Sequence, residues 1–209
     1  MSRLLAVACL LLAACSKTEP APAGSGAKTL GTVPLAAFAS FEAWCGRLSK
    51  GACKGEWEGH PPGTSALGAY RFVRVEYPEP KDGQGPVVDV FFELKTSRGF
   101  AYHLLGSTRT GKVTNSVMVK EVVDRPGALE LRVVYRTAPR FSYSDYYGSS
   151  FILEGPSGLA VVEVALGKIV GDINTGNTTG TIGEAQWQVG KVRVKGASIP
   201  DGEWSVSPQ

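Results

Sequence analysis

The stretch of sequence that decides the fold reads Val88-Asp89-Val90-Phe91-Phe92-Glu93-Leu94-Lys95. Apolar side chains stand at every second position from Val88 to Leu94, and charged side chains fill most of the positions between them. A period of two is typical of a β-strand with one buried face. Residues 129–136 repeat the pattern, with Leu and Val alternating with Glu and Arg. The sequence therefore predicts a half-buried strand at each place.

Similar but less regular runs extend this pattern over most of the chain. Short clusters rich in Gly, Pro and Asp separate the runs, at residues 81–83, 97–99, 124–127 and 155–158. Short turns between strands favour antiparallel pairing. The 26 glycines and the scarcity of helical periodicity after residue 50 favour an all-β fold, either an antiparallel β-sandwich or a partly open barrel. The additional strands are expected at 70–77, 100–105, 113–123, 150–153, 159–166 and 186–194.

One segment before the strands has a helical period instead. Apolar residues recur there at steps of three and four, with a proline at the start and a glycine just past the end. This arrangement predicts one short N-terminal amphipathic helix. The positions concerned are Pro34, Leu35, Phe38, Phe41, Cys45, Leu48 and Gly51.

The N-terminus has the layout of a secretory signal peptide. A single positive charge at Arg3 precedes an uninterrupted apolar run from Leu4 to Leu12. A helix over that run would measure about 14 Å, too short for a bilayer core of about 30 Å. The run ends in Leu12-Ala13-Ala14-Cys15, which resembles the lipobox of bacterial lipoproteins.

The resemblance implies cleavage before Cys15, a diacylglyceryl thioether on that cysteine and an acyl chain such as palmitate on the freed amine. Two or three chains would hold the mature protein durably on a membrane. Retention in the inner membrane of diderm bacteria is associated with Asp after the lipidated cysteine, and this chain has Ser16. The expected location is therefore the cell envelope, and the outer membrane if the host is diderm.

The expected domain organisation has three parts. Residues 1–14 form the signal peptide, residues 15–34 form the lipidated cysteine with a tether rich in Pro and Gly, and residues 35–209 form a single β-rich domain. Removing the signal peptide takes away only one of the 22 basic residues and leaves the 19 acidic ones. This near balance argues against nucleic acid as a partner.

The cysteines agree with an exported protein. Cys9 leaves with the signal peptide and Cys15 carries lipid, so Cys45 and Cys53 remain as a pair. In an oxidising compartment we expect them to form a disulfide, the alternative being two free thiols.

The best candidate for contact with a ligand or partner is an aromatic cluster at residues 140–147. The sequence predicts a loop between strands there, and aromatic rings beside polar groups are suited to holding glycans or proteins. The alternative is that the rings cap the end of the core. The residues are Phe141, Tyr143, Tyr146 and Tyr147.

Motifs for cofactors and metals are incomplete. The segment 106–112 fits the spacing of a phosphate loop, but Val113 follows where Ser or Thr would hold magnesium. Residues 172–178 place oxygen side chains as calcium loops do, yet Gly183 stands where the bidentate Glu is needed. The sequence predicts a hairpin loop and a polar turn, with no cofactor and no metal.

Catalytic motifs are also missing from the sequence. The two histidines, His60 and His103, belong to no recognised nucleophile or zinc motif. The leading hypothesis is a membrane-anchored, non-catalytic binding or assembly module whose partner is another envelope protein or a glycan. The alternatives are a glycan or peptidoglycan hydrolase using two carboxylates, and a carrier of a small apolar ligand.

Overall fold

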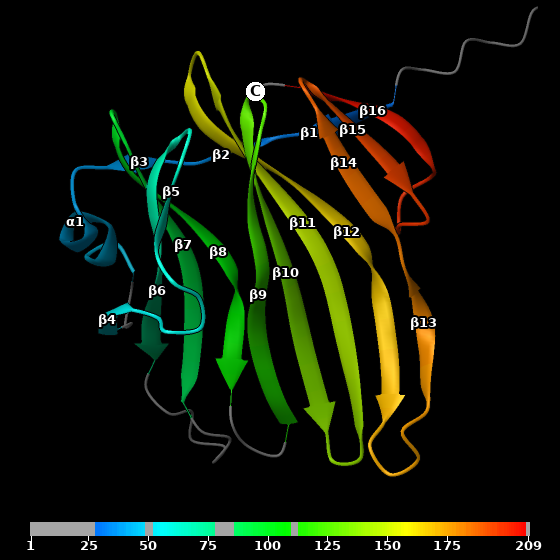
Figure 1. Ribbon diagram of the computed structural model, residues 1–209. Helices are drawn as coiled ribbons and strands as arrows, with labels where there is room; N and C mark the ends of the chain where they lie inside the picture. The colour runs from blue at the N-terminus through cyan, green and yellow to red at the C-terminus, as the bar shows by residue number, and fades with distance from the viewer. Residues whose placement is uncertain (1–27, 49–51, 78–85, 110–112, 208–209) are drawn as a thin grey trace, which may run out of the picture.

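The computed structural model describes residues 28–48, 52–77, 86–109 and 113–207. The fold over these residues is nearly all-β, with one large antiparallel sheet, one small sheet and one short helix (Figure 1). The outermost strands of the large sheet do not pair with each other within the described ranges, so it is not a closed barrel. The predicted fold class is confirmed.

The large sheet is mostly a meander in which each strand pairs antiparallel with the next. Two short strands, β4 and β5, also pair with β6 at one side. The predicted turns at 97–99, 124–127 and 155–158 join strands as expected, while 81–83 lies outside the described residues. The strands are β4 (Ala52–Glu56), β5 (Gly63–Ser65), β6 (Gly68–Tyr77), β7 (Val87–Thr96), β8 (Gly99–Arg109), β9 (Val113–Arg125), β10 (Ala128–Pro139), β11 (Ser142–Gly155), β12 (Gly158–Asp172) and β13 (Thr178–Ile182).

The small sheet contains β14 (Glu184–Gln188), β15 (Lys191–Lys195) and β16 (Gly202–Ser207), joined by β1 (Thr29–Gly31), which lies parallel to β16. The single strand predicted over 186–194 is wrong, because the chain reverses at Val189-Gly190 between β14 and β15. Gly190 has φ 73°, a left-handed conformation that glycine adopts without strain. One glycine thus turns an alternating run into a hairpin.

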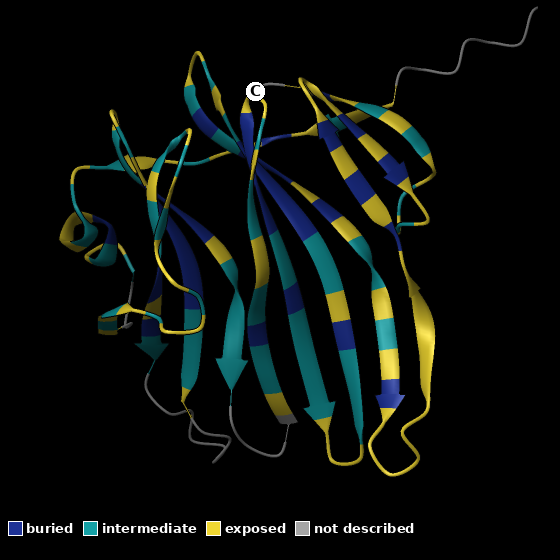
Figure 2. Cartoon of the chain, viewed as in Figure 1, coloured by how far each residue is buried: buried dark blue, intermediate teal, exposed yellow. Residues whose placement is uncertain are grey.

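The large sheet divides into two halves at β8 and β9. These strands share one described pair in register, Arg109 with Asn115, whereas β10 and β11 share ten. The half containing β6–β8 packs against the inner face of the half containing β10–β12, and Figure 2 shows buried residues gathered where the strands converge. Side chains from both halves form this core, including Phe72, Phe92, Leu94, Leu129, Leu131 and Ile152.

Both outer faces of the folded sheet are covered in part. The small sheet packs on the outer face of β10–β12, where Phe151 stacks on Trp187 at 5.4 Å between ring centroids. The helix packs on the outer face of β6–β8, where Trp44 stacks on Tyr102 at 3.9 Å. Alternation explains this layering, because neighbouring residues on one strand enter cores on opposite faces.

Residues 33–38, which we call the strap, connect the two halves. Its first part, β2 (Val33–Pro34), pairs with β12, and the Leu35 N–H donates to the Leu159 carbonyl at 2.9 Å. Its second part, β3 (Ala37–Phe38), pairs with β8. The strap therefore occupies free edges of both halves and holds them together.

The strap also explains why the predicted helix is shorter than expected. The helix α1 covers only Phe41–Cys45, and Ser40 caps it by accepting a hydrogen bond from the Ala43 N–H at 3.1 Å. Residues before Ser40 pair with open strand edges instead of with each other. Strands also begin at Thr29, so the folded part starts before the expected boundary at Leu35.

The disulfide between Cys45 and Cys53 is present and joins the end of α1 to β4. The lipobox, Cys15 and residues 16–27 lie outside the described residues. Within the described ranges, no helix combines the length and apolar character needed to cross a bilayer.

Replacing Leu35 by Ala should lower the free energy of unfolding by about 2 kcal/mol, because its side chain packs partly buried against the main core. Urea unfolding measures the change. Val33→Ala is the matched control in the same strap, and its exposed side chain should cost about 0.5 kcal/mol or less. Equal losses in the two variants would contradict the role of the strap in the core.

Removing the disulfide with Cys45→Ser and Cys53→Ser together should destabilise the protein by about 2 to 3 kcal/mol, because the bond restricts a short loop in the unfolded chain. Urea unfolding with and without a reductant tests this. The native protein should lose stability on reduction and the double variant should not. A reductant effect of the same size in both proteins would show that another cause is at work.

Candidate functional site

Three cross-strand rows of side chains on the inner face of β10–β12 build the candidate site. The register of the strands places each row directly, because paired residues in adjacent strands point to the same face. The floor row is Leu131, Ser150 and Glu163; the hollow row is Val133, Gly148 and Ala165; and the aromatic row is Tyr135, Tyr146 and Lys168.

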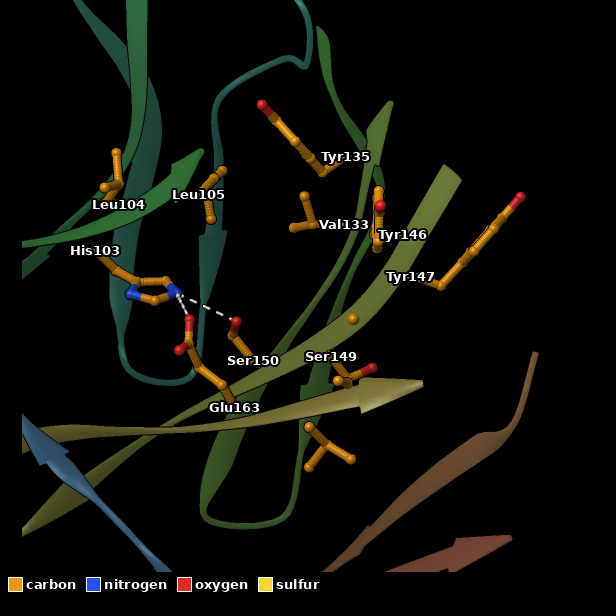
Figure 3. Close-up of a pocket in the computed structure, with 13 residues that line it drawn as sticks. His103, Leu104, Leu105, Val133, Tyr135, Tyr146, Tyr147, Ser149, Ser150 and Glu163 are labelled. Atoms are coloured by element: carbon orange, nitrogen blue, oxygen red, sulfur yellow. Dashed lines mark hydrogen bonds and ion pairs between the residues drawn. The ribbon is translucent and has the colours of Figure 1, made fainter. Parts of the chain in front are cut away.

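The hollow row leaves space because two of its three members have little or no side chain. Gly148 and Ala165 lie between the larger side chains of the floor and aromatic rows. Leu104 and Leu105 of β8 form the facing wall. The result is a cleft of about 250 Å³ with the floor row at one end and tyrosines at the other (Figure 3).

Two β-bulges, one on β12 and one on β8, change which side chains point to the inner face of the sheet. Leu166 is the extra residue on β12, because Gly148 pairs with Ala165 while Tyr147 pairs with Gly167. On β8, Leu105 is extra between Leu104 and Gly106. A bulge shifts the alternation of side chains by one position. Glu163 and Lys168 therefore share a face although five residues separate them in the sequence.

The floor of the cleft holds a buried histidine. His103 of β8 is 7% exposed, and its Nε2 lies 3.2 Å from Ser150 Oγ and 3.4 Å from Glu163 Oε1. Burial lowers the pKa of His103 to about 4, so the imidazole is neutral at pH 7. Because the imidazole is neutral, its contact with Glu163 is not an ion pair.

This group differs from a catalytic triad in its geometry. In a triad, the hydroxyl and the carboxylate contact opposite nitrogens of the imidazole. Here Ser150 and Glu163 both approach Nε2. A histidine with a pKa near 4 is also a weak general base at neutral pH. The arrangement is better suited to forming hydrogen bonds with a ligand.

The aromatic cluster predicted from sequence is only partly assembled. The expected loop is wrong, because Ser142–Gly155 form strand β11, in register with β10 and β12. Tyr146 lines the cleft and is 42% exposed. Tyr147 also borders it, but Figure 3 shows its ring pointing away from His103. Strand alternation therefore separates rings that are adjacent in the sequence.

The other two predicted contact residues lie elsewhere. Tyr143 lies under the Arg136 guanidinium at 4.5 Å, and that guanidinium forms a bidentate ion pair with Asp145. Phe141 is exposed at the turn between β10 and β11. The Ile173 N–H donates to the Phe141 carbonyl, so this turn is adjacent to the β12–β13 turn. Neither residue borders the cleft.

A second polar cluster lies on the opposite face of β9–β11. Glu130 is fully buried, yet hydrogen bonds from Arg132, Arg125 and Ser149 outweigh the effect of burial and hold its pKa below the usual range. Arg132 also donates to Glu121. The carboxylate and its donors are thus already paired, and the cluster ties three strands together.

The polar turn after β12 is held by its own backbone. Asp172 Oδ1 accepts hydrogen bonds from the N–H groups of Thr175 and Asn174, and these bonds lower the pKa of Asp172. This is an Asx-type turn, as the sequence indicated. Among residues that the structure describes, no three His, Cys, Asp or Glu side chains gather to hold a metal ion. Residues 110–112 of the incomplete phosphate loop lie outside those described.

Comparisons with protein families, with curated proteins and with solved structures found no match to this chain.

The pKa of His103 predicts a pH dependence of stability. The unfolded histidine takes up a proton below about pH 6.5, whereas the folded one does so only near pH 4. Stability is therefore complete above that upper value and falls as the pH drops toward 4, by up to roughly 3 kcal/mol. Urea unfolding at a series of pH values should show this slope reduced in His103→Gln.

His60→Gln is the matched control, because His60 lies in the segment between β4 and β5, away from the cleft. It should keep the native slope between pH 4 and 6.5. An unchanged slope in His103→Gln would mean that His103 titrates normally in the folded protein.

Proposed function

We propose that the protein is a non-catalytic, membrane-anchored binding module of the cell envelope, with its ligand held in the cleft between β8 and β10–β12. The lipobox ending at Cys15 supports the anchor, and the open cleft supports the binding role. Small-molecule sites are typically concave and mostly apolar, with a few placed polar groups that orient the ligand. The cleft has this composition.

The observation that carries the proposal is the polar floor. His103 and Ser150 are buried next to the apolar core formed by the two halves of the sheet. Burying such groups costs free energy, and an apolar pair would pack there more favourably. Because the floor faces an open hollow, its polar atoms can contact a ligand that enters past Tyr146.

The described chain begins at the opposite end of the fold from two of its hairpin turns. Strand β1, the first strand of the described chain, lies at the top in Figure 1, and the β10–β11 and β12–β13 turns lie at the bottom. A lipid on Cys15 would therefore hold the strap end near the membrane and leave the far turns accessible to other envelope components.

The geometry favours binding over the two alternatives from the sequence. A hydrolase of the two-carboxylate type needs a second acidic group, and Glu163 is the only acidic residue among those lining the cleft. A purely apolar ligand could form no hydrogen bonds with His103 and Ser150 at the floor. The carrier alternative makes a different prediction in the experiment below.

Filling the hollow with Ala165→Phe should remove the bound ligand. The full-length lipidated protein, purified in mild detergent from its own membranes, would be examined by native mass spectrometry. We expect the native protein to carry a small molecule and Ala165→Phe to lack it, because the ring would occupy the space beside Gly148. An apolar lipid released from the cleft would favour the carrier alternative.

Val189→Phe is the matched control, since it places the same ring at an exposed turn of the small sheet. It should retain the ligand. Equal occupancy in all three proteins, or no occupancy in any of them, would contradict binding in the cleft.

A further inference from the structure

Opposite charges lie in the cleft and in the hollow beside it: Glu163 lines the cleft, and Lys168 borders the neighbouring hollow next to Tyr146. The Glu163 side chain is 65% exposed, and its Oε1 lies 3.4 Å from Nε2 of the neutral His103. The Lys168 ammonium lies over the ring of Tyr146, 4.8 Å from its centroid. Within the described part of the chain, neither side chain forms an ion pair with an Arg, Lys, Asp or Glu.

The separation of these charges defines the length of a matching ligand. Glu163 pairs with Ser150 and Lys168 pairs with Tyr146, so their rows are four residues apart along β11. At about 3.4 Å per residue, the rows are roughly 14 Å apart. Side chains that lean inward shorten the distance between the charged atoms.

A neighbouring hollow borders the path between Glu163 and Lys168. A second hollow of about 440 Å³ shares Tyr146 and Ala165 with the cleft and is bordered by Lys168, Gly180 and Ser198. A ligand could therefore extend from the floor row, over the hollow row, to the ammonium of Lys168. An elongated ligand fits this path better than a compact one.

We infer that the cleft binds a short zwitterionic peptide, with its ammonium group at Glu163 and its carboxylate at Lys168. This inference rests on the proposed binding function and names the ligand class of the same site. An extended tripeptide measures about 10 Å, which matches the row spacing once the Glu and Lys side chains reach inward. The peptide groups between its ends would face Ser150 and the backbone beside Gly148.

Charge distinguishes this ligand from a neutral saccharide. A saccharide would pack on Tyr146 and bond to Ser150, but it would leave both charges uncompensated. A ligand with one charge would compensate only one end. A zwitterion satisfies both ends at once and leaves the net charge of the protein unchanged.

The test uses the full-length protein in detergent and isothermal titration with trialanine, N-acetyl-trialanine and trialanine amide. Trialanine should bind the native protein, and blocking either end should weaken binding about fivefold. In Glu163→Gln, N-acetylation should make no further difference, while amidation still weakens binding. In Lys168→Gln, amidation should make no further difference, while N-acetylation still weakens binding.

Glu154→Gln and Lys195→Gln are matched controls, because they remove the same charges from exposed positions outside the cleft. Both should retain the native response to each probe. Glu163 and Lys168 are themselves exposed, so the melting temperatures of their variants should stay close to native.

Three outcomes would overturn the inference. Failure of trialanine to bind, while Ala165→Phe still loses a native ligand, would reject the peptide but retain the binding module. Binding of chitobiose that is insensitive to both charge substitutions would identify a neutral glycan instead. Absence of both a native ligand and any titration response would reject the binding function together with the inference.

Discussion

The pairing of residues 33–38 with both halves of the large sheet is the constraint on which the rest of the structure depends. β8 and β9 are in register at one described residue pair, so few described backbone pairs join the two halves at this point of the meander. The strap pairs with β12 at Val161 and with β8 at Ala101. Because unpaired strand edges are costly when buried, this pairing stabilises both edges and closes the halves over their common core.

The candidate cleft follows from this closure. His103 belongs to β8 and Glu163 to β12, and the strap pairs with each of these strands a few residues away. The distance between the two side chains is therefore set by backbone pairing and not by a contact between neighbouring strands. A site whose members come from strands tied in this way is held more rigidly than one built on loops.

Small residues and a β-bulge in β11 and β12 determine the shape of the cleft and which side chains lie beside it. Gly148 and Ala165 leave the space, and the bulge at Leu166 brings Lys168 to the same face as Glu163. Bulges are common where a sheet redirects a side chain for binding. The polar floor is less stable than an apolar core of the same shape would be, while apolar clusters under α1 and the small sheet cover parts of both outer faces.

The sequence by itself determined the all-β class, most of the strand positions, three of the turns and the disulfide, because periodicity, turn residues and cysteine count are local properties. The lipobox at Cys15 and the tether remain predictions from sequence. Only the tertiary structure decided that residues 33–34 and 37–38 are strands, that residues 142–147 begin strand β11 instead of forming a loop, and that His103, Ser150 and Glu163 meet. Open edges on β8 and β12 override the helical pattern, and the bulges change which side chains share a face. Both effects depend on pairing between residues distant in the sequence, which no local pattern records.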